Sequence, residues 1–397
     1  WLGLAGPGGP RANLSAGVGP VKPKTPPRGL TARPGLTYAD WMRPLGKGRR
    51  GMREAMLYDK LDQGRVACRL CAHGCRIKPE GRGICQVRVN QDGVLQTLVW
   101  GKPIAGNPDP IEKKPLFHFL PGSRSYSIAT VGCNFQCAFC QNWDISQFPR
   151  QAGREVIPGG GPGGELVEPE QIVAAAQAQD CASISYTYTE PTIYFEYAYD
   201  CMRLAVERGL RNVFVSNGYE SADCVAACRG LLHAANIDLK AFRDDFYRQE
   251  CKARLQPVLD TLKAMRAAGI WLEVTTLVIP GKNDDPEELK ELAEFLVREL
   301  SPDTPWHVSA YTPRYKYEQS GPPPTPVKSL EKAVEIGRKA GLRFVYAGNA
   351  PGHNSESTAC PSCGRIVVGR RGFRVTGLDL NNGACPTCNR PIPGVWA

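Results

Sequence analysis

The sequence predicts an α/β protein whose central part is a partial TIM-type (β/α)6 barrel. A Cys-rich module precedes the barrel, and a zinc-ribbon-like or rubredoxin-like module follows it. From Ser125 onwards, short apolar runs alternate with amphipathic helical segments, which is typical of repeated βα units around a parallel sheet. Eleven of the sixteen cysteines fall into three tight groups, one inside this region and one on each side of it. A chain of 397 residues has room for one large domain and small appendages.

Residues 1–53 are expected to form a disordered tail, because a Gly- and Pro-rich segment without apolar periodicity cannot offset its ordering entropy by burial. Ten Lys and Arg residues against one Asp give this tail a net charge of +9, out of +10 for the chain. The basic charge therefore lies outside the expected folded part, so it is only a weak argument for a nucleic-acid partner, which we do not expect. The tail lacks the apolar stretch of a secretory signal, and no apolar run follows Arg49-Arg50 as in a twin-arginine signal. Met52 and Met56 are more natural starting residues than Trp1.

The cysteine spacing and the hydropathy indicate whether the cysteines are reduced and whether the chain crosses a membrane. Close Cys-x-x-Cys spacing suits thiolates that converge on a metal, whereas disulfide frameworks usually join distant segments. No run of eighteen or more apolar residues occurs, so we expect no membrane-spanning helix. We expect reduced cysteines and an oxygen-sensitive, cytoplasmic protein.

Residues 54–125 are predicted to form the first module. Strand-like stretches at 86–88 and 94–99 flank a turn at 90–93. Four thiolates in this module have the capacity to hold zinc or an auxiliary 4Fe–4S cluster, and the sequence leaves the metal open. This N-terminal cysteine group consists of Cys68, Cys71, Cys75 and Cys85.

The barrel is predicted to span residues 126–350. Its expected strands are 127–131, 182–186, 212–216, 236–239, 271–278, 306–310 and 343–346. Its expected helices lie near 169–179, 192–208, 221–231, 254–268, 285–299 and 326–340. Gly209 and Gly269 fit as C-terminal caps, and Asp285-Pro286 as a helix start. Some six units over this length suit an incomplete barrel better than an eightfold one, and a doubly wound sheet is the alternative.

Residues 351–397 are predicted to form a terminal metal-binding module. Their cysteines have the spacing C-x2-C-x21-C-x2-C, in which two knuckles present four thiolates for a tetrahedral site. Zinc is the expected metal, iron the alternative, and the expected role is structural or protein-docking. This C-terminal cysteine group consists of Cys360, Cys363, Cys385 and Cys388.

The central cysteine group, Cys133, Cys137 and Cys140, directly follows the first barrel strand with the spacing C-x3-C-x2-C. A 4Fe–4S cubane normally takes four thiolates, so three local cysteines leave one iron open for a small molecule. The alternative is a zinc site with a remote fourth ligand, yet the nearest histidine, His118, lies fifteen residues upstream. The other five cysteines lie in segments expected to be core.

This motif resembles the signature of the radical S-adenosylmethionine (SAM) superfamily. The surrounding segments 110–119, 186–192, 215–219, 236–242 and 306–311 look like the radical SAM member of the AmmeMemoRadiSam system, a group similar to pyruvate formate-lyase activating enzymes. The resemblance covers about residues 54–397. It implies that the open iron binds SAM, and that reductive cleavage gives a 5′-deoxyadenosyl radical, which abstracts hydrogen from a substrate.

The resemblance also implies roles for polar residues that we expect at the carboxyl ends of barrel strands. Glu190 would bind the SAM amino group with Asn217 nearby, Asp238 and Lys240 would hold the ribose and carboxylate, and His307 would contact the SAM end of the site. The alternatives are a carboxylate at a helix N-terminus for Glu190, a plain ion pair for Asp238 and Lys240, and a core histidine for His307.

The leading hypothesis is therefore a SAM-dependent enzyme that makes a glycyl radical on a protein or functionalises a small molecule. The resemblance further implies a reductant such as flavodoxin or ferredoxin, and Memo-like and AMMECR-type partner proteins. A nucleic-acid-binding zinc-ribbon protein and a structural metalloprotein are the competing hypotheses. The sequence does not identify the substrate.

Overall fold

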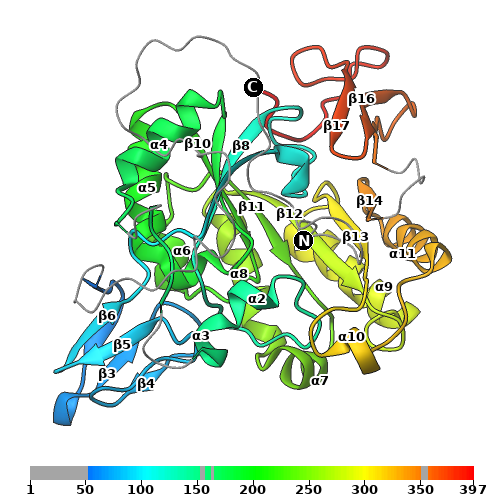
Figure 1. Cartoon of the computed structure of the whole chain (residues 1–397). Coiled ribbons are helices and arrows are strands. Elements are labelled where there is room, and N and C mark those ends of the chain that lie inside the picture. The colour runs from blue at the N-terminus through cyan, green and yellow to red at the C-terminus, as the bar shows by residue number, and fades with distance from the viewer. Residues whose placement is uncertain (1–51, 153–156, 162–164, 350–355) are drawn as a thin grey trace.

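The computed structural model describes residues 52–152, 157–161, 165–349 and 356–397. Its main element is an eight-stranded sheet with the order β14-β13-β12-β11-β10-β9-β8-β7 (Figure 1). Strands β8 to β14 pair in parallel, and β7 pairs antiparallel with β8. The strands are β7 (Ala105–Pro110), β8 (Arg124–Ala129), β9 (Ser183–Tyr186), β10 (Arg211–Ser216), β11 (Ala234–Asp238), β12 (Trp271–Val278), β13 (Trp306–Ala310) and β14 (Val345–Gly348).

Six helical crossovers connect the seven parallel strands, which confirms the predicted partial (β/α)6 barrel. Figure 1 shows these helices around the outer side of the sheet. They contain α4 (Pro169–Ala178), α5 (Phe195–Glu207), α6 (Ala222–Ala227), α8 (Leu255–Ala267), α9 (Pro286–Phe295) and α11 (Val327–Lys339). Shorter elements are α2 (Trp143–Ser146), α3 (Phe148–Gln151), α7 (Asp244–Phe246), α10 (Tyr317–Ser320), the 3-10 turns at Asp62–Gly64, Ile111–Lys113 and Pro191–Tyr194, and the π-helical turns Tyr247–Cys251 and Leu296–Leu300.

The helix ends follow the predicted capping chemistry. Asp285 accepts the backbone N–H groups of Glu287 and Glu288 at the start of α9. Gly209 and Gly269, just past α5 and α8, take φ values of +75° and +78°. Helix α6 ends several residues earlier than predicted, and Gly230 follows it with a φ of +76°.

Strand β7 extends the barrel sheet beyond the predicted boundary at residue 125. The prediction placed its residues in the first module, because a Gly-Asn-Pro-Asp-Pro sequence does not resemble a strand. Proline lacks a backbone N–H and is tolerated in a sheet mainly at an edge, and β7 is an edge strand. The N-terminal module proper is therefore shorter than predicted.

The N-terminal module contains two small antiparallel sheets, β1-β6-β5 and β2-β3-β4. Strands β5 and β6 form the predicted hairpin, whose turn residues Asp92 and Gly93 both have positive φ. The predicted tail lies almost entirely outside the described residues, except that Arg53 belongs to β1. The strands are β1 (Arg53–Glu54), β2 (Tyr58–Lys60), β3 (Val66–Cys68), β4 (Arg76–Ile77), β5 (Arg88–Gln91) and β6 (Val94–Thr97).

The C-terminal module is a three-stranded sheet of β15 (Thr358–Ala359), β16 (Ile366–Arg371) and β17 (Arg374–Leu378). It packs against the loop between β7 and β8, where Val395 N–H donates to the carbonyl of His118 at 2.7 Å. This loop lies at the amino end of β8, so the module covers the amino ends of the parallel strands. Figure 1 shows the N-terminal module at the other end of the sheet.

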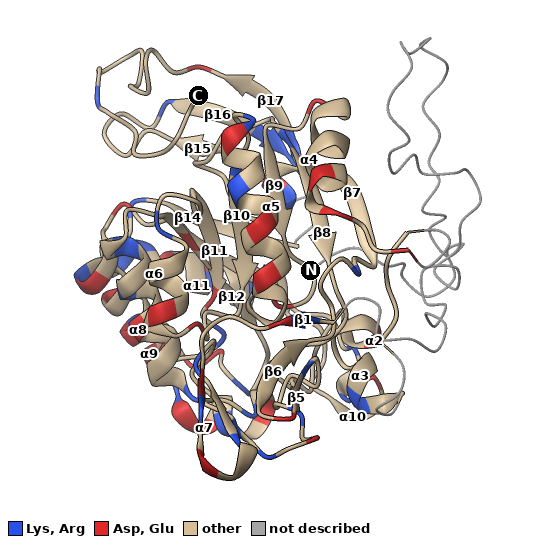
Figure 2. Cartoon of the chain, turned by 90° about the vertical axis from the view of Figure 1, so that its left-hand side faces the viewer, with Lys and Arg blue, Asp and Glu red and all other residues tan. Residues whose placement is uncertain are grey.

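The surface of the barrel carries charges of both signs. Figure 2 shows acidic and basic residues on the helices that face the viewer. Within the described residues, no helix is both long enough and apolar enough to cross a membrane.

Candidate active site

A cavity of about 340 Å³ opens at the carboxyl ends of the parallel strands, and all three cysteines of the central group line it. Glu190, Asn217, Asp238 and Lys240 line the same cavity. The structure thus brings together seven of the eight residues predicted around the cluster and SAM. They come from four different βα connections, as is usual for sites at the carboxyl end of a barrel.

The loop after β8 positions the three cysteine sulfurs. Gly132 begins it with a φ of +104°, and a Cβ there would stand only 2.8 Å from Val87 Cγ1, so the close approach of the N-terminal module requires glycine. Within the loop, the Phe135 N–H lies 3.3 Å from Cys133 Sγ, and Ser146 Oγ lies 3.2 Å from Cys140 Sγ. Hydrogen bonds of this kind orient thiolate ligands and tune a bound cluster.

Cys251, at the end of the π-helical turn, lies behind the loop and was not predicted to belong to the site. Its carbonyl accepts the N–H of Gln136 at 2.9 Å. A hydrogen bond that the Cys137 thiol donates to Cys251, followed by burial, raises the pKa of Cys137. Cys251 does not line the cavity, so it does not occupy the position facing the three sulfurs. Cys251 is one of five cysteines outside the three groups, and nothing in the sequence around it predicts this contact.

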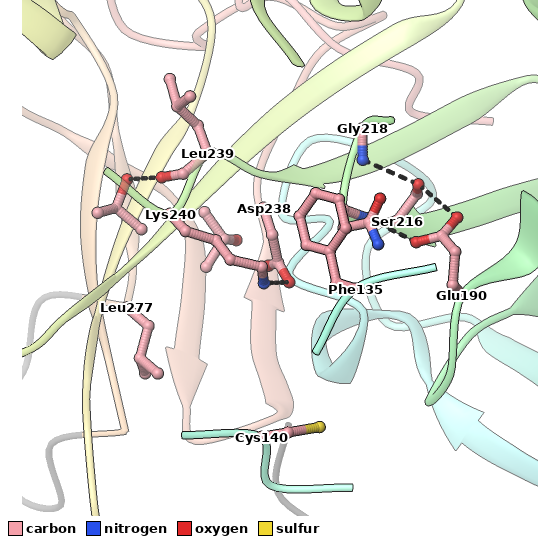
Figure 3. A network of polar contacts seen from close by, with 12 residues as sticks. Phe135, Cys140, Glu190, Ser216, Gly218, Asp238, Leu239, Lys240 and Leu277 are labelled. Carbon is pink, nitrogen blue, oxygen red and sulfur yellow. Dashed lines mark hydrogen bonds and ion pairs between the residues drawn. The ribbon is translucent and has the colours of Figure 1, made fainter. Parts of the chain in front are cut away.

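Glu190 is a buried carboxylate that is held on both oxygens. Its Oε1 accepts from Thr192 Oγ1 at 2.5 Å and from Ser216 Oγ at 2.9 Å, and its Oε2 accepts from Asn217 N at 2.8 Å. Figure 3 shows Glu190 beside Ser216, which links it in turn to Gly218. Burial raises the pKa of Glu190, although these hydrogen bonds oppose the shift. The side chain also caps the turn at Pro191, so the predicted alternative role at a helix start is present as well.

Glu220 is a second buried carboxylate that the sequence analysis missed. Ser216 Oγ lies 2.8 Å from its Oε1, and its Oε2 has no hydrogen-bond partner. Burial and then the neighbouring charge of Glu190 raise the pKa of Glu220 to about 8. At neutral pH Glu220 therefore holds a proton, and the pair carries less negative charge than two separate carboxylates would. No local motif marks Glu220, because the pairing depends on the fold of the loop after β10.

Asp238 and Lys240 form an ion pair at the end of β11, with Lys240 Nζ 2.8 Å from Asp238 Oδ2 (Figure 3). Both side chains are mostly buried. The backbone of Lys240 is fixed by Tyr247, whose hydroxyl accepts its N–H at 2.9 Å, and by Asn283, whose amide donates to its carbonyl. The pair is therefore anchored from two sides while its charged ends face the cavity.

His307 is not part of this cavity. It lies near the amino end of β13, where its Nε2 is 2.7 Å from Glu273 Oε2 at the corresponding end of β12. A carboxylate accepts only, so this ring nitrogen carries the proton. The structure does not bring His307 to this cavity, because its strand runs toward the cavity and His307 is only the second residue of that strand. Its actual place matches the alternative of a core histidine.

A polar cluster in the same cavity centres on Asp109 of the unpredicted strand β7. Asp109 accepts from Lys114 Nζ at 2.7 Å, from Ser127 Oγ at 2.8 Å and from the hydroxyl of Tyr188. Burial disfavours the charged carboxylate, but Lys114 and the hydrogen bonds hold the pKa of Asp109 below its ordinary value. Asp109, Lys113, Lys114 and Tyr188 line the cavity. The neighbouring residues Lys113 and Lys114 were the only signal in the sequence. Strand β7, which precedes them, was not predicted because of its prolines.

The distances between the cysteine sulfurs distinguish the C-terminal group from the other two groups. Among the described residues, the C-terminal group is the one set of three or more ligands whose atoms all lie within 4.8 Å of one another. Its Sγ atoms are 3.5 Å apart for Cys360 and Cys388, and 3.6 Å apart for Cys363 and Cys385. Four sulfurs bound at 2.3 Å to one zinc ion lie about 3.8 Å apart, so this group fits a single ion. The central group is wider, and it faces an open cavity, which fits a cubane with one iron accessible.

Comparisons with known proteins agree with this geometry. A family model described as the radical SAM superfamily matches residues 127–296. The chain is 44% identical over 343 residues to an uncharacterized protein of Methanocaldococcus jannaschii, and the match covers 86% of this chain and 99% of that protein. A radical SAM methyltransferase from Sphaerobacter thermophilus has a TM-score of 0.45 at 15% identity, over 80% of this chain and 81% of that chain. A domain of a pyruvate-formate lyase-activating enzyme from Bacteroides vulgatus has a TM-score of 0.37 at 17% identity, over 42% of this chain and 99% of that chain. The chain belongs to the radical SAM superfamily.

Proposed function

We propose that this enzyme cleaves SAM reductively, in the cytoplasm, at a 4Fe–4S cluster held by Cys133, Cys137 and Cys140. The observation that carries the proposal is that the three cysteines share one cavity with a carboxylate, a lysine and an amide, each suited to a different part of SAM. When bound, the cluster supplies the electron that splits SAM into methionine and a 5′-deoxyadenosyl radical, which takes hydrogen from the substrate.

The protein's own groups would bind SAM and keep water away. Glu190 accepts hydrogen bonds on both oxygens, which favour its charged form, so it is suited to the SAM ammonium. Lys240 offers a cation for the SAM carboxylate, and Asp238 and Asn217 offer hydrogen bonds for the ribose and amino groups. The aromatic side chains of Phe135 and Phe139 also line the cavity and would limit water around the sulfurs.

We further propose that the C-terminal cysteine group holds zinc with a structural role. Its spacing supports a single ion, and its module is linked to the barrel through a chain of buried hydrogen bonds. His118 Nδ1 donates to the carbonyl of Pro393 at 2.7 Å, and its Nε2 accepts from Tyr346, whose hydroxyl lies 2.9 Å from Thr358 Oγ1. Burial lowers the pKa of His118 to about 4, which keeps the ring neutral in this chain of contacts.

The substrate that gives up hydrogen to the radical is proposed only as a class of molecule. The resemblance to the AmmeMemoRadiSam group favours a glycyl radical on a protein or a small-molecule product, with Memo-like and AMMECR-type proteins as partners. Asp109, Lys113 and Lys114 line the same cavity as the cysteines and would contact a substrate there.

The decisive experiment is anaerobic reconstitution with iron and sulfide, reduction, and chromatographic assay of 5′-deoxyadenosine. Cys133→Ala, Cys137→Ala and Cys140→Ala should each abolish the product. Cys181→Ala, which removes a buried cysteine that does not line the cavity, is the matched control and should retain it. Undiminished 5′-deoxyadenosine from any of the three variants would contradict the proposal. A protein that contains only zinc would support the structural-metalloprotein alternative.

A further inference from the structure

The N-terminal cysteine group surrounds a small enclosed cavity that is separate from the active site. Its four cysteines line this cavity together with Arg88, His73 and Asn134. Cys68 and Cys85 are buried, and Cys71 and Cys75 are partly exposed. The sulfurs of Cys75 and Cys85 lie 3.9 Å and 3.8 Å from the point where a Cβ on Gly83 would stand. Four thiols therefore converge on one space, and the absent side chain of Gly83 leaves that space open.

The sulfurs of this group are spread more widely than those of the single-ion site in the C-terminal module. Among the described residues, only the C-terminal group has three or more ligand atoms all within 4.8 Å of one another, and the N-terminal group does not meet that limit. Zinc requires sulfurs about 3.8 Å apart. In a cubane each sulfur binds a different iron at a different corner, so the ligand sulfurs stand further apart. In this respect the N-terminal group matches the central group and differs from the zinc-spaced group in the same molecule.

The cavity also provides positive charge for a cluster with four thiolates. Arg88 is 1% exposed, and its Nη1 lies 3.4 Å from Cys68 Sγ. Its Nη2 pairs with the buried carboxylate of Glu196, and its Nε has no hydrogen-bond partner. A buried guanidinium beside a cysteine sulfur suits a site whose metal centre carries net negative charge.

The cavity adjoins the loop of the central cysteine group. A Cβ on Gly132 would stand 3.3 Å from the carbonyl oxygen of Cys85. Arg150 Nη2 donates to the carbonyl oxygens of both Ile84 and Cys133 at 2.8 Å, and so joins the two cysteine loops. Asn134, next to Cys133, lines the N-terminal cavity, and its carbonyl lies 2.9 Å from His73 Nε2. One layer of residues therefore separates the two groups.

We propose that Cys68, Cys71, Cys75 and Cys85 hold a second 4Fe–4S cluster, which passes electrons to the iron at Cys133, Cys137 and Cys140. The partly exposed side at Cys71 and Cys75 would receive one electron from a one-electron donor protein of the flavodoxin or ferredoxin class. The donor is oxidised by one electron, and the same electron moves inward to the central site, so no bond or proton changes hands. The relay rests on the proposed function, whereas the metal assignment does not.

The first test measures metal content in the full chain without the central ligands. The variant Cys133→Ala/Cys137→Ala/Cys140→Ala, reconstituted anaerobically, should hold about four irons and about four sulfides per chain, with broad absorption near 400 nm. Adding Cys71→Ser to this variant should remove most of that iron. A second equivalent of zinc in place of iron, or no metal beyond one zinc, would overturn the assignment. This readout is independent of SAM cleavage, so it separates the cluster from the proposed function.

The second test keeps the central ligands and covers the case in which the triple variant fails to fold. Cys71→Ser/Cys75→Ser changes the two partly exposed cysteines, and its iron content should fall from about eight to about four per chain. Its 5′-deoxyadenosine formation should fall with reduced flavodoxin as donor but persist with titanium(III) citrate, a small reductant able to enter the active-site cavity. Unchanged iron would overturn the cluster assignment, and an unchanged flavodoxin-driven rate would overturn the relay.

Discussion

Replacing His307 with Ala tests whether this residue supports the fold or binds the cofactor. The ring donates to Glu273, a fully buried carboxylate, and packs against Phe117 and Tyr346 with ring centroids 4.7 Å and 5.3 Å apart. Burial opposes the charge of Glu273, and His307 is the main group that holds its pKa below the ordinary value. Three donors remain in the variant: the backbone N–H groups of residues 117 and 118 and the indole of Trp271.

The magnitude follows from these contacts. A lost hydrogen bond to a buried charged group costs about 1.5–3 kcal/mol, and the lost aromatic contacts add about 1 kcal/mol. We expect His307→Ala to lower the free energy of unfolding by about 2.5–4 kcal/mol. His307→Gln is the matched control, because a Gln side chain keeps an N–H donor near Glu273, and it should lose about half as much.

The assay is anaerobic urea unfolding of variants with equal iron and zinc content, followed by calorimetric titration with SAM. The SAM dissociation constant should stay within about twofold of the wild-type value, since a tenfold change corresponds to about 1.4 kcal/mol of binding energy that His307 is not placed to supply. Unchanged stability together with tenfold weaker SAM binding would refute this interpretation and restore the cofactor role first expected for His307.

Four further results are expected. Glu220→Gln tests the raised pKa of Glu220, which lies at about 8 instead of 4.5. Between these two pH values the folded state holds one proton more than the unfolded state. The stability of the wild-type protein therefore falls as the pH rises through that window. The Gln variant should lack this fall and gain on the order of a few kcal/mol relative to wild type above pH 8, measured by urea unfolding at pH 5 and pH 9; parallel pH profiles would contradict the shift. Lys240→Met should weaken SAM binding by about tenfold, or about 1.4 kcal/mol, because it removes the cation at the cavity wall, whereas Lys263→Met on the exposed face of α8 should leave SAM binding unchanged. Gly132→Ala should cost about 1–3 kcal/mol of stability, because φ is +104° and the new methyl would meet Val87, and a fully stable variant would rule out that close approach. Cys385→Ser should release the zinc proposed for the C-terminal module and expose the buried His118 contacts, seen as faster hydrogen exchange at residues 117–119, while exchange at α8 stays unchanged.

The barrel could be predicted from local patterns, because each strand and helix carries its own periodicity and caps. The runs at 271–278 and 306–310 match β12 and β13 to the residue. The central cysteine group could also be predicted, since its three ligands lie within eight consecutive residues. Glu190, Asp238 and Lys240 reach the cavity because the carboxyl ends of parallel strands meet at one edge. Closely spaced ligands and the ends of strands can both be predicted from neighbouring residues in the sequence.

The tertiary structure alone decided the rest, because those features join segments that are far apart in the chain. Strand β7 forms at a sheet edge despite its two prolines, and it adds Asp109 to the cavity. His307 lies at the start of its strand instead of the end, so it contacts Glu273 and does not line the cavity. Glu220 and Cys251 carry no motif, and they reach the site through the folding of loops. Both four-cysteine groups offer four thiolates, but the distances between their sulfurs differ, and only the packing of their loops could set those distances.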